Sequence, residues 1–556
     1  MGIFIHLAVS KSVAKAEWRK VYGETLKLAK AFQLAETRTV NCRGVDVLCL
    51  TPTKERKTEG SFWNGYKPRT GWQADGDYET MCTAESYHLF KELADDEGGD
   101  PDAGDAMMGA LPSRLDYDWD DPRVKKIFRL WGDKTQGEPY HMYLLAIGCL
   151  IESRLGKKAF VYGDITRGQC KKAVELANGF LKTPIDIPAR CDLERFFQRV
   201  SELPLTELER MEVFEAFYLG EQSAEFGELL RANYSAEACA AYWKGAFSEC
   251  RIGTIGFGDN VNKYLTLGFD LEELCSLISF DKKKGETEQY KEFIRGIMDA
   301  KLHVKDKNCT DPLAIDQEDE HPYGIWSLFA QFAFIGARNR KVDRYIPIEE
   351  VRSALISGLR GKMSAKAVNA IIDEYLDKEA KQAEVRVTPD MTLEEMEKAV
   401  KTDASEALRQ GLENKRQALQ EHRERYDITD FEDLLYYEPG NTMPPGLAKS
   451  LGKSYPVYHG TTKEKTYKDL MKESPLTRCL WLAKQNRYLL LRDEDWEDIF
   501  DDIEENPKSF ERYYPMARID ISKSSLAQMV RAMVLNDDLY AYCQEAAKLY
   551  AKDDDE

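Results

Sequence analysis

The sequence predicts a helix-dominated, multidomain α+β protein, and three observations lead to this expectation. The chain has 556 residues, which is too many for a single hydrophobic core, because domains average about 150–200 residues. Its composition is 43% hydrophobic and 11% aromatic, which is enough apolar material to fill several cores. Apolar residues recur every three to four positions through the middle of the chain, whereas both ends combine helical spacing with short strand-like runs. We therefore expect a small N-terminal α+β unit, a large helical middle and a smaller C-terminal α+β domain.

Shifts in composition set the expected domain boundaries. Residues 94–112 are acidic, glycine-rich and aperiodic, which is typical of a solvated loop between domains. Residues 377–430 are highly charged and carry only a thin apolar stripe, which favours a helix that bridges domains or contacts a partner. These segments separate an N-terminal α+β domain (1–93), a mainly helical domain (113–376) and a C-terminal α+β domain (431–556).

The first fifty residues predict a strand, a helix and a hairpin. Residues 2–9 form a short apolar run, as expected for a strand. From Trp18 to Phe32, apolar residues recur on one face of a helix. Residues 37–50 then alternate between apolar and polar around a turn at 41–44, which is the signal of a β-hairpin.

An aromatic-rich stretch follows at 60–79. Phe62, Trp63, Tyr66 and Trp72 lie there among four glycines, and aromatic rings on flexible turns can stack on a base or a sugar. Under this interpretation the protein is a nucleotide or sugar sensor, and these four residues bind the ligand. The alternative is a loop whose aromatic rings cover the edge of the hairpin sheet.

Three aspartates after the acidic loop are a candidate metal site. Asp116, Asp118 and Asp120 are spaced two residues apart, and clustered carboxylates can hold Mg²⁺. Because Pro122 and a basic helix start follow them, the alternative is that they cap a helix.

The middle of the chain is expected to be mostly helical. An apolar helix at 141–155 precedes a short strand at 158–162, and Thr166 and Gln169 then form a capping box for the next helix. Further helices are expected at 207–219, 225–234, 236–247, 271–279, 286–300, 324–337 and 348–359. The glycine-rich residues 251–260 interrupt this pattern and predict an interhelical loop, since no βαβ context surrounds them.

The candidate catalytic stretch lies at 455–462, where a short apolar run is expected to form a strand that leads into a turn. The residues Tyr458-His459-Gly460-Thr461 resemble the His-Gly-Thr element of ADP-ribosyltransferases. The resemblance implies that NAD is the cofactor, that His459 and Thr461 orient it, and that Tyr488 is a further site residue.

The same resemblance implies an order of elements around this site. It predicts a helix near 466–471, a strand at 479–483 and a strand at 516–521. The last strand carries Asp520 where the family places its catalytic glutamate. A helix at 493–503, with one apolar and one acidic face, is an addition to the family's pattern.

The net charge indicates which classes of partner are unlikely, and the cysteines indicate the compartment. The formal net charge is −19, which repels phosphate backbones and makes nucleic acid and anionic membranes unlikely partners. The longest apolar segment, 324–337, is too short to span a bilayer. Twelve cysteines are scattered without a C-x-x-C pair, which is typical of a reducing compartment. A cytoplasmic location is therefore expected.

The sequence contains no local metal, nucleotide or nucleophile signature of high specificity. The leading hypothesis is therefore a non-catalytic protein-binding or regulatory protein, without a cofactor, whose partner is another protein. A role in bacterial defence or toxin neutralisation is a further hypothesis that rests on the acidic charge alone. The alternatives are the NAD-dependent transferase and the ligand sensor.

Overall fold

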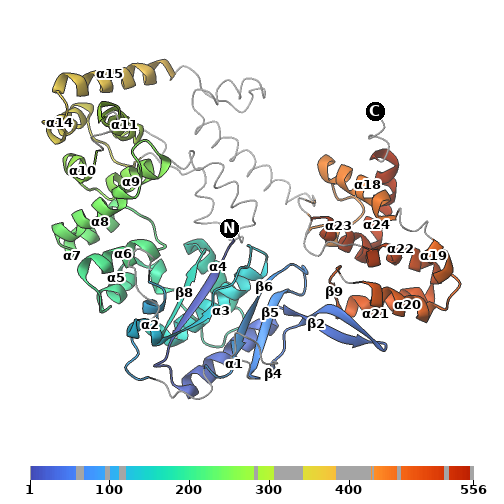
Figure 1. The fold of residues 1–556 in the computed structure, drawn as a ribbon. Helices are drawn as coiled ribbons and strands as arrows, with labels where there is room; N and C mark the ends of the chain where they lie inside the picture. The colour runs from blue at the N-terminus through green and yellow to red at the C-terminus, as the bar shows by residue number, and fades with distance from the viewer. Residues whose placement is uncertain are drawn as a thin grey trace. The chain divides into compact units, whose positions relative to one another are not determined.

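The computed structural model describes residues 2–57, 68–93, 100–111, 121–280, 286–305, 342–382, 428, 431, 433–459, 465–486, 488–518 and 525–550. The fold is α+β and dominated by helices, as the sequence predicts (Figure 1).

The chain divides into two compact units. Unit 1 consists of Met1–Val21, Leu93–Gly137 and Leu144–Lys415, and unit 2 of Tyr22–Glu92, Glu138–Tyr143 and Arg416–Glu556. Both units combine segments that lie far apart in the sequence, whereas the predicted domains are contiguous. The predicted domain boundaries stay a prediction.

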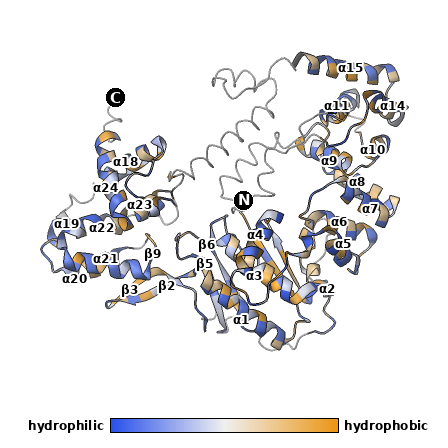
Figure 2. Cartoon of the chain, turned by 180° about the vertical axis from the view of Figure 1, so that it is seen from behind, coloured by the Kyte–Doolittle hydropathy of each residue, from blue (hydrophilic) through white to orange (hydrophobic). Residues whose placement is uncertain are grey.

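Unit 1 contains a three-stranded antiparallel sheet in the order β7-β1-β8. The central strand β1 (Ile5–Ser10) pairs with β7 (Ile127–Trp131) on one side and with β8 (Ala159–Gly163) on the other. Helix α3 (Tyr140–Leu155), which is apolar along most of its length (Figure 2), packs against this sheet. A Cβ at Gly148 would lie 2.8 Å from Cγ2 of Val161, so glycine permits the close approach of α3 to β8.

The rest of unit 1 is a succession of helices around one large core. They are α2 (Pro122–Lys125), α4 (Arg167–Asn178), α5 (Leu193–Ser201), α6 (Glu207–Phe217), α7 (Ala224–Asn233), α8 (Ala236–Ser248), α9 (Ile255–Thr266), α10 (Leu271–Leu277), α11 (Glu286–Asp299), α14 (Ile348–Gly358) and α15 (Ala365–Gln382), with short 3-10 helices at Ala106–Gly109, Gly156–Lys158 and Ala189–Cys191. Trp243, Phe214 and Phe293 are among the fully buried side chains that these helices share.

Unit 2 contains a second sheet in the order β4-β5-β2-β3-β9, with β6 paired to β5. Its strands are β2 (Leu34–Cys42), β3 (Val45–Pro52), β4 (Arg56–Lys57), β5 (Thr70–Asp77), β6 (Thr83–Phe90) and β9 (Leu491–Arg492), and helix α1 (Lys15–Ala31) leads into β2. Strand β3 pairs in parallel with β9 through Cys49 with Leu491 and Leu50 with Arg492. The N-terminal hairpin and the C-terminal helices therefore share one core.

The C-terminal part of unit 2 is helical. It consists of α18 (Pro445–His459), α19 (Lys465–Leu470), α20 (Pro475–Gln485), α21 (Asp493–Glu505), α22 (Phe510–Tyr513), α23 (Ser525–Leu535) and α24 (Asp537–Tyr550), with 3-10 helices at Asp433–Tyr436, Pro507–Ser509 and Tyr514–Arg518. Trp496, Phe500 and Ile503 form the buried face of α21, which is the face that its sequence pattern predicts.

Several predicted elements are confirmed. The hairpin closes at Arg43-Gly44, where both residues have positive φ, as a two-residue type I′ turn requires. Thr166 and Gln169 form the predicted capping box of α4. The strand near the N-terminus, the helix at 141–155 and the helix at 493–503 are also present as β1, α3 and α21.

The strand expected at 455–462 is wrong. Residues Tyr455–His459 are the last turn of α18, and 460–462 lie outside the described residues. Ala448, Leu451 and Tyr455 recur at helical spacing, and α18 packs on α24 so closely that a Cβ at Gly452 would lie 2.7 Å from the carbonyl oxygen of Ala546. Pro456 lies inside this helix, where proline is unfavourable.

Two further predicted strands are helical where the structure describes them. Residues 479–483 belong to helix α20, whose start is marked by the cap Ser474 and by Pro475 in its first turn. A short continuous apolar run does not distinguish a buried strand from a buried helix, whereas these start signals do. Of the strand expected at 516–521, residues 516–518 belong to the 3-10 helix Tyr514–Arg518, and residues 519–521 lie outside the described residues.

The interhelical loop expected at 251–260 is shorter than predicted. Helix α9 begins at Ile255, and Phe257 and Val261 are buried on its inner face. Gly256 and Gly258 lie in the first turns of this helix, and its buried apolar face stabilises it in spite of them. The predicted helix at 324–337 and nearly all of the predicted charged helix, from 383 onward, lie outside the described residues.

Candidate functional site

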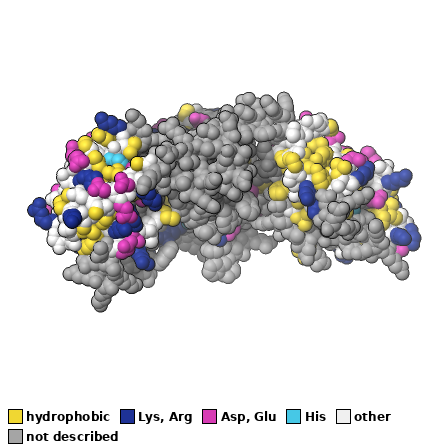
Figure 3. Space-filling view, turned by 90° about the horizontal axis from the view of Figure 1, so that it is seen from above, with side chains coloured by type: hydrophobic (Ala, Val, Ile, Leu, Met, Phe, Trp, Pro, Cys, Tyr) yellow, Lys and Arg dark blue, Asp and Glu magenta, His cyan; other side chains and the backbone are white. Residues whose placement is uncertain are grey.

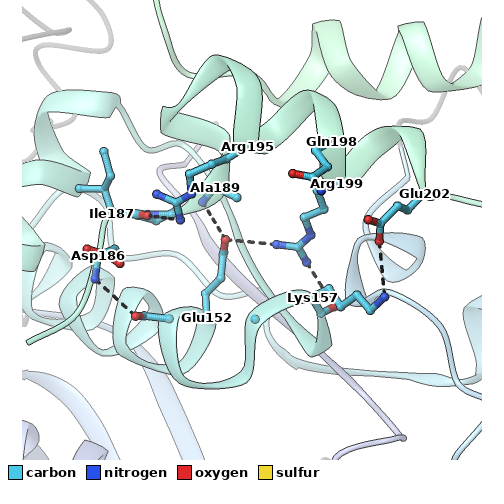
Figure 4. Close-up of a pocket in the computed structure, with 12 residues that line it drawn as sticks. Glu152, Lys157, Asp186, Ile187, Ala189, Arg195, Gln198, Arg199 and Glu202 are labelled. Carbon is cyan, nitrogen blue, oxygen red and sulfur yellow. Dashed lines mark hydrogen bonds and ion pairs between the residues drawn. The ribbon is translucent and has the colours of Figure 1, made fainter. Parts of the chain in front are cut away.

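Among the residues that the structure describes, a pocket on the surface of unit 1 is a candidate site. It lies beside α3 and α5 and encloses a volume of about 280 Å³ (Figure 4). It is lined by Glu152, Ser153, Gly156, Lys157, Asp186, Ile187, Pro188, Ala189, Arg195, Gln198, Arg199 and Glu202. Three of these side chains are cationic and three are anionic, so the pocket carries charges of both signs.

The floor of the pocket is a buried ion network around Arg199. Its guanidinium donates from Nε to Asp105 Oδ2 at 2.9 Å and from Nη2 to Asp105 Oδ1 at 2.8 Å. Both side chains are only 9% exposed. A two-point pair of this kind fixes orientation as well as charge. Nη2 also donates to the carbonyl oxygen of Ala159 at 2.9 Å, so Arg199 is held rigidly.

Glu152 is the second member of the floor and is 4% exposed. Its carboxylate accepts from the backbone N–H of Val161 at 2.9 Å, from the N–H of Ala189 at 3.3 Å and from Arg199 Nη1 at 3.3 Å. Burial raises the pKa of Glu152, while Arg199 and the backbone donors act in the opposite direction. Each carboxylate oxygen therefore already has a donor within the protein.

The same network covers the outer edge of strand β8. Glu152 accepts the N–H of Val161, Arg190 Nη1 donates to the Val161 carbonyl oxygen at 3.3 Å, and Arg199 reaches Ala159. An edge strand presents unpaired backbone groups that must be satisfied or hidden. These charged side chains are buried because they satisfy the groups that a fourth strand would otherwise pair.

Three cysteines meet behind the floor. Cys149 of α3, Cys170 of α4 and Cys191 are buried, and the thiol of Cys170 shares hydrogen bonds with the other two. The contact with Cys149 raises the pKa of Cys170, and the contact with Cys170 raises the pKa of Cys191. Thiols of raised pKa are poor nucleophiles, so this cluster packs as neutral side chains.

The rim of the pocket is exposed and weakly constrained. Lys157 Nζ lies 3.5 Å from Glu202 Oε2, and their side chains are 69% and 54% exposed. Arg195 Nη2 donates to the carbonyl oxygen of Ile187 at 3.3 Å. The pocket thus combines a fixed floor, in which the charges are paired, with a rim that can reorient towards a ligand.

The candidate transferase residues lie in a helical environment. His459 is the last residue of α18, and its ring packs 4.3 Å from that of Tyr455 and 5.6 Å from that of Tyr540. Burial lowers the pKa of His459 to about 4. Tyr488 is 42% exposed and follows α20, and Thr461 lies outside the described residues. The role of these residues with NAD stays a prediction.

Of the four candidate stacking residues, the structure describes only Trp72. It lies on strand β5 and not on a flexible turn, it is 1% exposed, and its Nε1 donates to Thr25 Oγ1 at 3.2 Å. Ligand stacking would therefore have to come from Phe62, Trp63 and Tyr66, which lie outside the described residues.

We expect Trp72→Phe to lower the free energy of unfolding of unit 2 by about 1–2 kcal/mol, because it removes a buried hydrogen bond and part of the core. Urea denaturation measures this effect. Thermal unfolding with a panel of nucleotides and sugars provides the control, since any ligand-induced shift should be the same for wild type and variant. A variant of unchanged stability that loses such a shift would contradict the core role.

The candidate metal ligands Asp116, Asp118 and Asp120 also lie outside the described residues. Among the residues that the structure does describe, no group of three or more His, Cys, Asp or Glu side chains is placed to hold a metal ion.

Comparisons with known proteins leave the site to be interpreted from its chemistry alone. No protein-family model, no curated protein and no solved structure matches this chain. Across the described part of the chain, no helix combines the length and apolar character needed to cross a membrane.

The pocket was not predicted from the sequence, although one signal was present. Glu152 interrupts the apolar run of the helix expected at 141–155, and an acidic residue at a core-facing position requires a buried partner. Its partner Arg199 lies 47 residues later, and Asp105, which Arg199 also binds, lies 47 residues earlier, so no local pattern connects the three residues.

Proposed function

We propose that this chain is a cytoplasmic, non-catalytic binding protein, and that the pocket of unit 1 seats a charged side chain of a partner protein. The observation that carries the proposal is the contrast between floor and rim. Glu152 and Arg199 are already bonded within the protein, whereas Lys157, Arg195 and Glu202 at the rim reach solvent.

This contrast favours binding over catalysis. A general acid, base or nucleophile must have a free position within hydrogen-bonding distance of the reacting atom. The buried charges of the floor use their positions to satisfy β8 and one another. The volume of about 280 Å³ is close to the lower limit of small-molecule pockets, which is about 300 Å³, so it suits one side chain better than a cofactor.

Two further observations support a protein partner in a reducing compartment. Figure 3 shows hydrophobic side chains on the surface of the C-terminal part of the chain. In the same unit, Tyr436 and Leu549 are 54% and 71% exposed. Exposed apolar patches are typical of contact surfaces. The described cysteines are all free, as expected for a cytoplasmic protein. The hypothesis of bacterial defence or toxin neutralisation still rests on the acidic charge alone.

Charge reversal at the rim tests the proposal. The full chain, tagged and immobilised, is used to capture proteins from a lysate of the source cells, as wild type and as Arg195→Glu. The matched control is Lys472→Glu, which makes the same change in charge at a side chain that is 75% exposed in unit 2. We expect a stoichiometric partner with wild type and control, and at least tenfold less of it with Arg195→Glu.

Two outcomes would contradict the proposal. Equal capture by all three proteins would place the partner elsewhere than in the pocket, and no capture would remove the protein-binding function. Thermal unfolding with NAD forms the second arm. Stabilisation by NAD that disappears in His459→Ala would favour the transferase alternative instead.

A further inference from the structure

The β2–β3 hairpin of unit 2 extends beyond the rest of its sheet (Figure 1). Its two strands pair with each other over eight residue pairs, from Ala35 with Pro52 to Cys42 with Val45. Strand β5 pairs with β2 only at Leu34 and Ala35. Among the residues that the structure describes, the distal half of β2 therefore pairs with a strand on one side only.

The register shows which backbone groups point away from β3. Cys42 and Val45 flank a two-residue turn, so they form a hydrogen-bonded pair, and every second residue from Cys42 points its backbone groups inward. The residues between them point outward. Thr37 confirms this assignment, because its N–H leaves the ladder and donates to Asp75 Oδ2 at 2.6 Å.

The next outward residues along the same edge are Thr39 and Asn41. Within the part of the chain that the structure describes, no hydrogen bond engages the backbone groups that these two residues point outward. Both side chains lie on the solvent-facing side of the hairpin, opposite the face that packs on α20 and α21. The backbone N–H and C=O groups of these two residues are therefore available to pair with an added strand.

The tip of the hairpin is held rigidly although its edge is open. Arg43 in the turn forms ion pairs with Glu497, Asp501 and Glu504 of α21, at 2.9 Å for Glu497 and 3.2 Å for Glu504. Cys42 Sγ also donates to Glu497 Oε1 at 3.1 Å. An edge fixed in this way loses little conformational entropy when another strand pairs with it.

The charge beside the edge indicates the kind of strand that it would take. Nine of the thirteen residues of α21 are acidic, and the three that meet Arg43 remain 43–61% exposed. With a net charge of −19, a second copy of this chain would bring the same acidic helix to the contact. Electrostatic complementarity favours a basic partner.

We propose that the outer edge of β2 at Thr39 and Asn41 binds an extended, lysine- or arginine-rich segment of a partner protein as an added β-strand. Main-chain hydrogen bonds supply the affinity in this mode of recognition, and the acidic face of α21 supplies the selectivity for basic residues. The inference rests on the proposed function only in that the partner is a protein, and it does not require the pocket.

Proline at the edge tests the main-chain hydrogen bonds. Because the N–H of Thr39 points outward, Thr39→Pro removes a donor from the edge without removing one from the β2–β3 ladder. Thr39→Val is the matched control, since it keeps the N–H and changes only the side chain. Thr39→Lys keeps the backbone and places a like charge beside the basic strand, so it tests the edge even if the proline variant unfolds.

The probe is a labelled peptide, Lys-Thr-Lys-Val-Lys-Thr-Lys-Val, with a peptide in which glutamate replaces each lysine as its counterpart. Fluorescence anisotropy with the full chain measures Kd. We expect the lysine peptide to bind wild type and Thr39→Val equally, at least tenfold more weakly to Thr39→Pro, and several-fold more weakly to Thr39→Lys. Affinity should fall as salt concentration rises, and the glutamate peptide should not bind.

Equal binding to Thr39→Val and a folded Thr39→Pro, or no binding of the lysine peptide to wild type, would overturn the inference. Self-association that light scattering detects in wild type and not in Thr39→Pro would assign the edge to a second copy and also overturn it. Partner capture separates the two proposals. If Thr39→Pro still captures the partner that Arg195→Glu loses, the pocket stands and the partner does not use this edge.

Discussion

Replacing Arg199 with methionine is expected to destabilise unit 1 by about 3–5 kcal/mol, the range for removing one partner of a buried ion pair. The guanidinium pairs with both Asp105 and Glu152, which are 9% and 4% exposed. Its loss leaves two carboxylates in a medium of low dielectric without their shared cation. The backbone N–H of Met107 still serves Asp105, and those of Val161 and Ala189 still serve Glu152, so the loss is not complete.

A second, exposed ion pair in the same pocket provides a control for Arg199→Met. Lys157 and Glu202 also form an ion pair, but both are mostly exposed, and an exposed pair contributes about 0–1 kcal/mol. Lys157→Met should therefore leave stability nearly unchanged, although it removes one positive charge from the same pocket, as Arg199→Met does. The comparison separates the effect of burial from the effect of charge.

Because the chain has two compact units, a single unfolding transition is not assumed. Hydrogen exchange of peptides from α3 and β8, measured at increasing urea concentration, gives the opening free energy of this region directly. If Arg199→Met and Lys157→Met lower this opening free energy by similar amounts, Arg199 does not stabilise unit 1 through a buried ion network.

Prediction from the sequence succeeded where the determining contacts are local. The capping box of Thr166 and Gln169 closes within one turn, and the turn at Arg43-Gly44 fixes the register of the hairpin by itself. The failures at 455–459 and 479–483 have different causes. The run at 455–459 is short and apolar, and its helix packs against the distant helix α24. At 479–483 the cap Ser474 and Pro475 are local signals that indicate a helix.

The functional surfaces were less accessible to prediction because each depends on distant pairings. Glu152 meets Arg199 only after β8 and α5 have folded against α3. The distal edge of β2 stays open in the described part of the chain because β5, which begins at Thr70, pairs with β2 only at Leu34 and Ala35. Neither arrangement leaves a periodic trace in the sequence.

His141 is expected to make the stability of the protein depend on pH. Its side chain is fully buried at the start of α3, and burial lowers its pKa to about 3, whereas an unfolded histidine has a pKa of about 6.5. The folded state therefore keeps His141 neutral, while the unfolded state takes up a proton as the pH falls below 6.5. Stability is complete above pH 6.5 and is lost progressively as the pH falls towards 3.

One proton taken up by the unfolded state alone lowers stability by about 1.4 kcal/mol per pH unit. Between pH 6.5 and pH 5 this amounts to about 2 kcal/mol. Urea denaturation followed by circular dichroism, at pH 8, 7, 6 and 5, should show this loss in wild type and a smaller loss in His141→Gln. The difference in free energy of unfolding between wild type and His141→Gln should be constant from pH 8 to 7 and should become smaller below pH 6.5.

The choice of pH range separates His141 from Glu379, and the comparison with His141→Gln cancels the contribution of buried carboxylates of raised pKa, such as Glu152. Hydrogen bonds from His303 and Lys301 lower the pKa of Glu379 to about 2. The stability that ionised Glu379 contributes is therefore lost only as the pH falls from about 4.5 towards 2. Acidification above pH 5 therefore leaves Glu379 ionised in both states. Parallel curves for wild type and His141→Gln from pH 7 to 5 would mean that His141 accepts a proton in the folded protein, and that α3 opens far enough at this position for water to reach the ring.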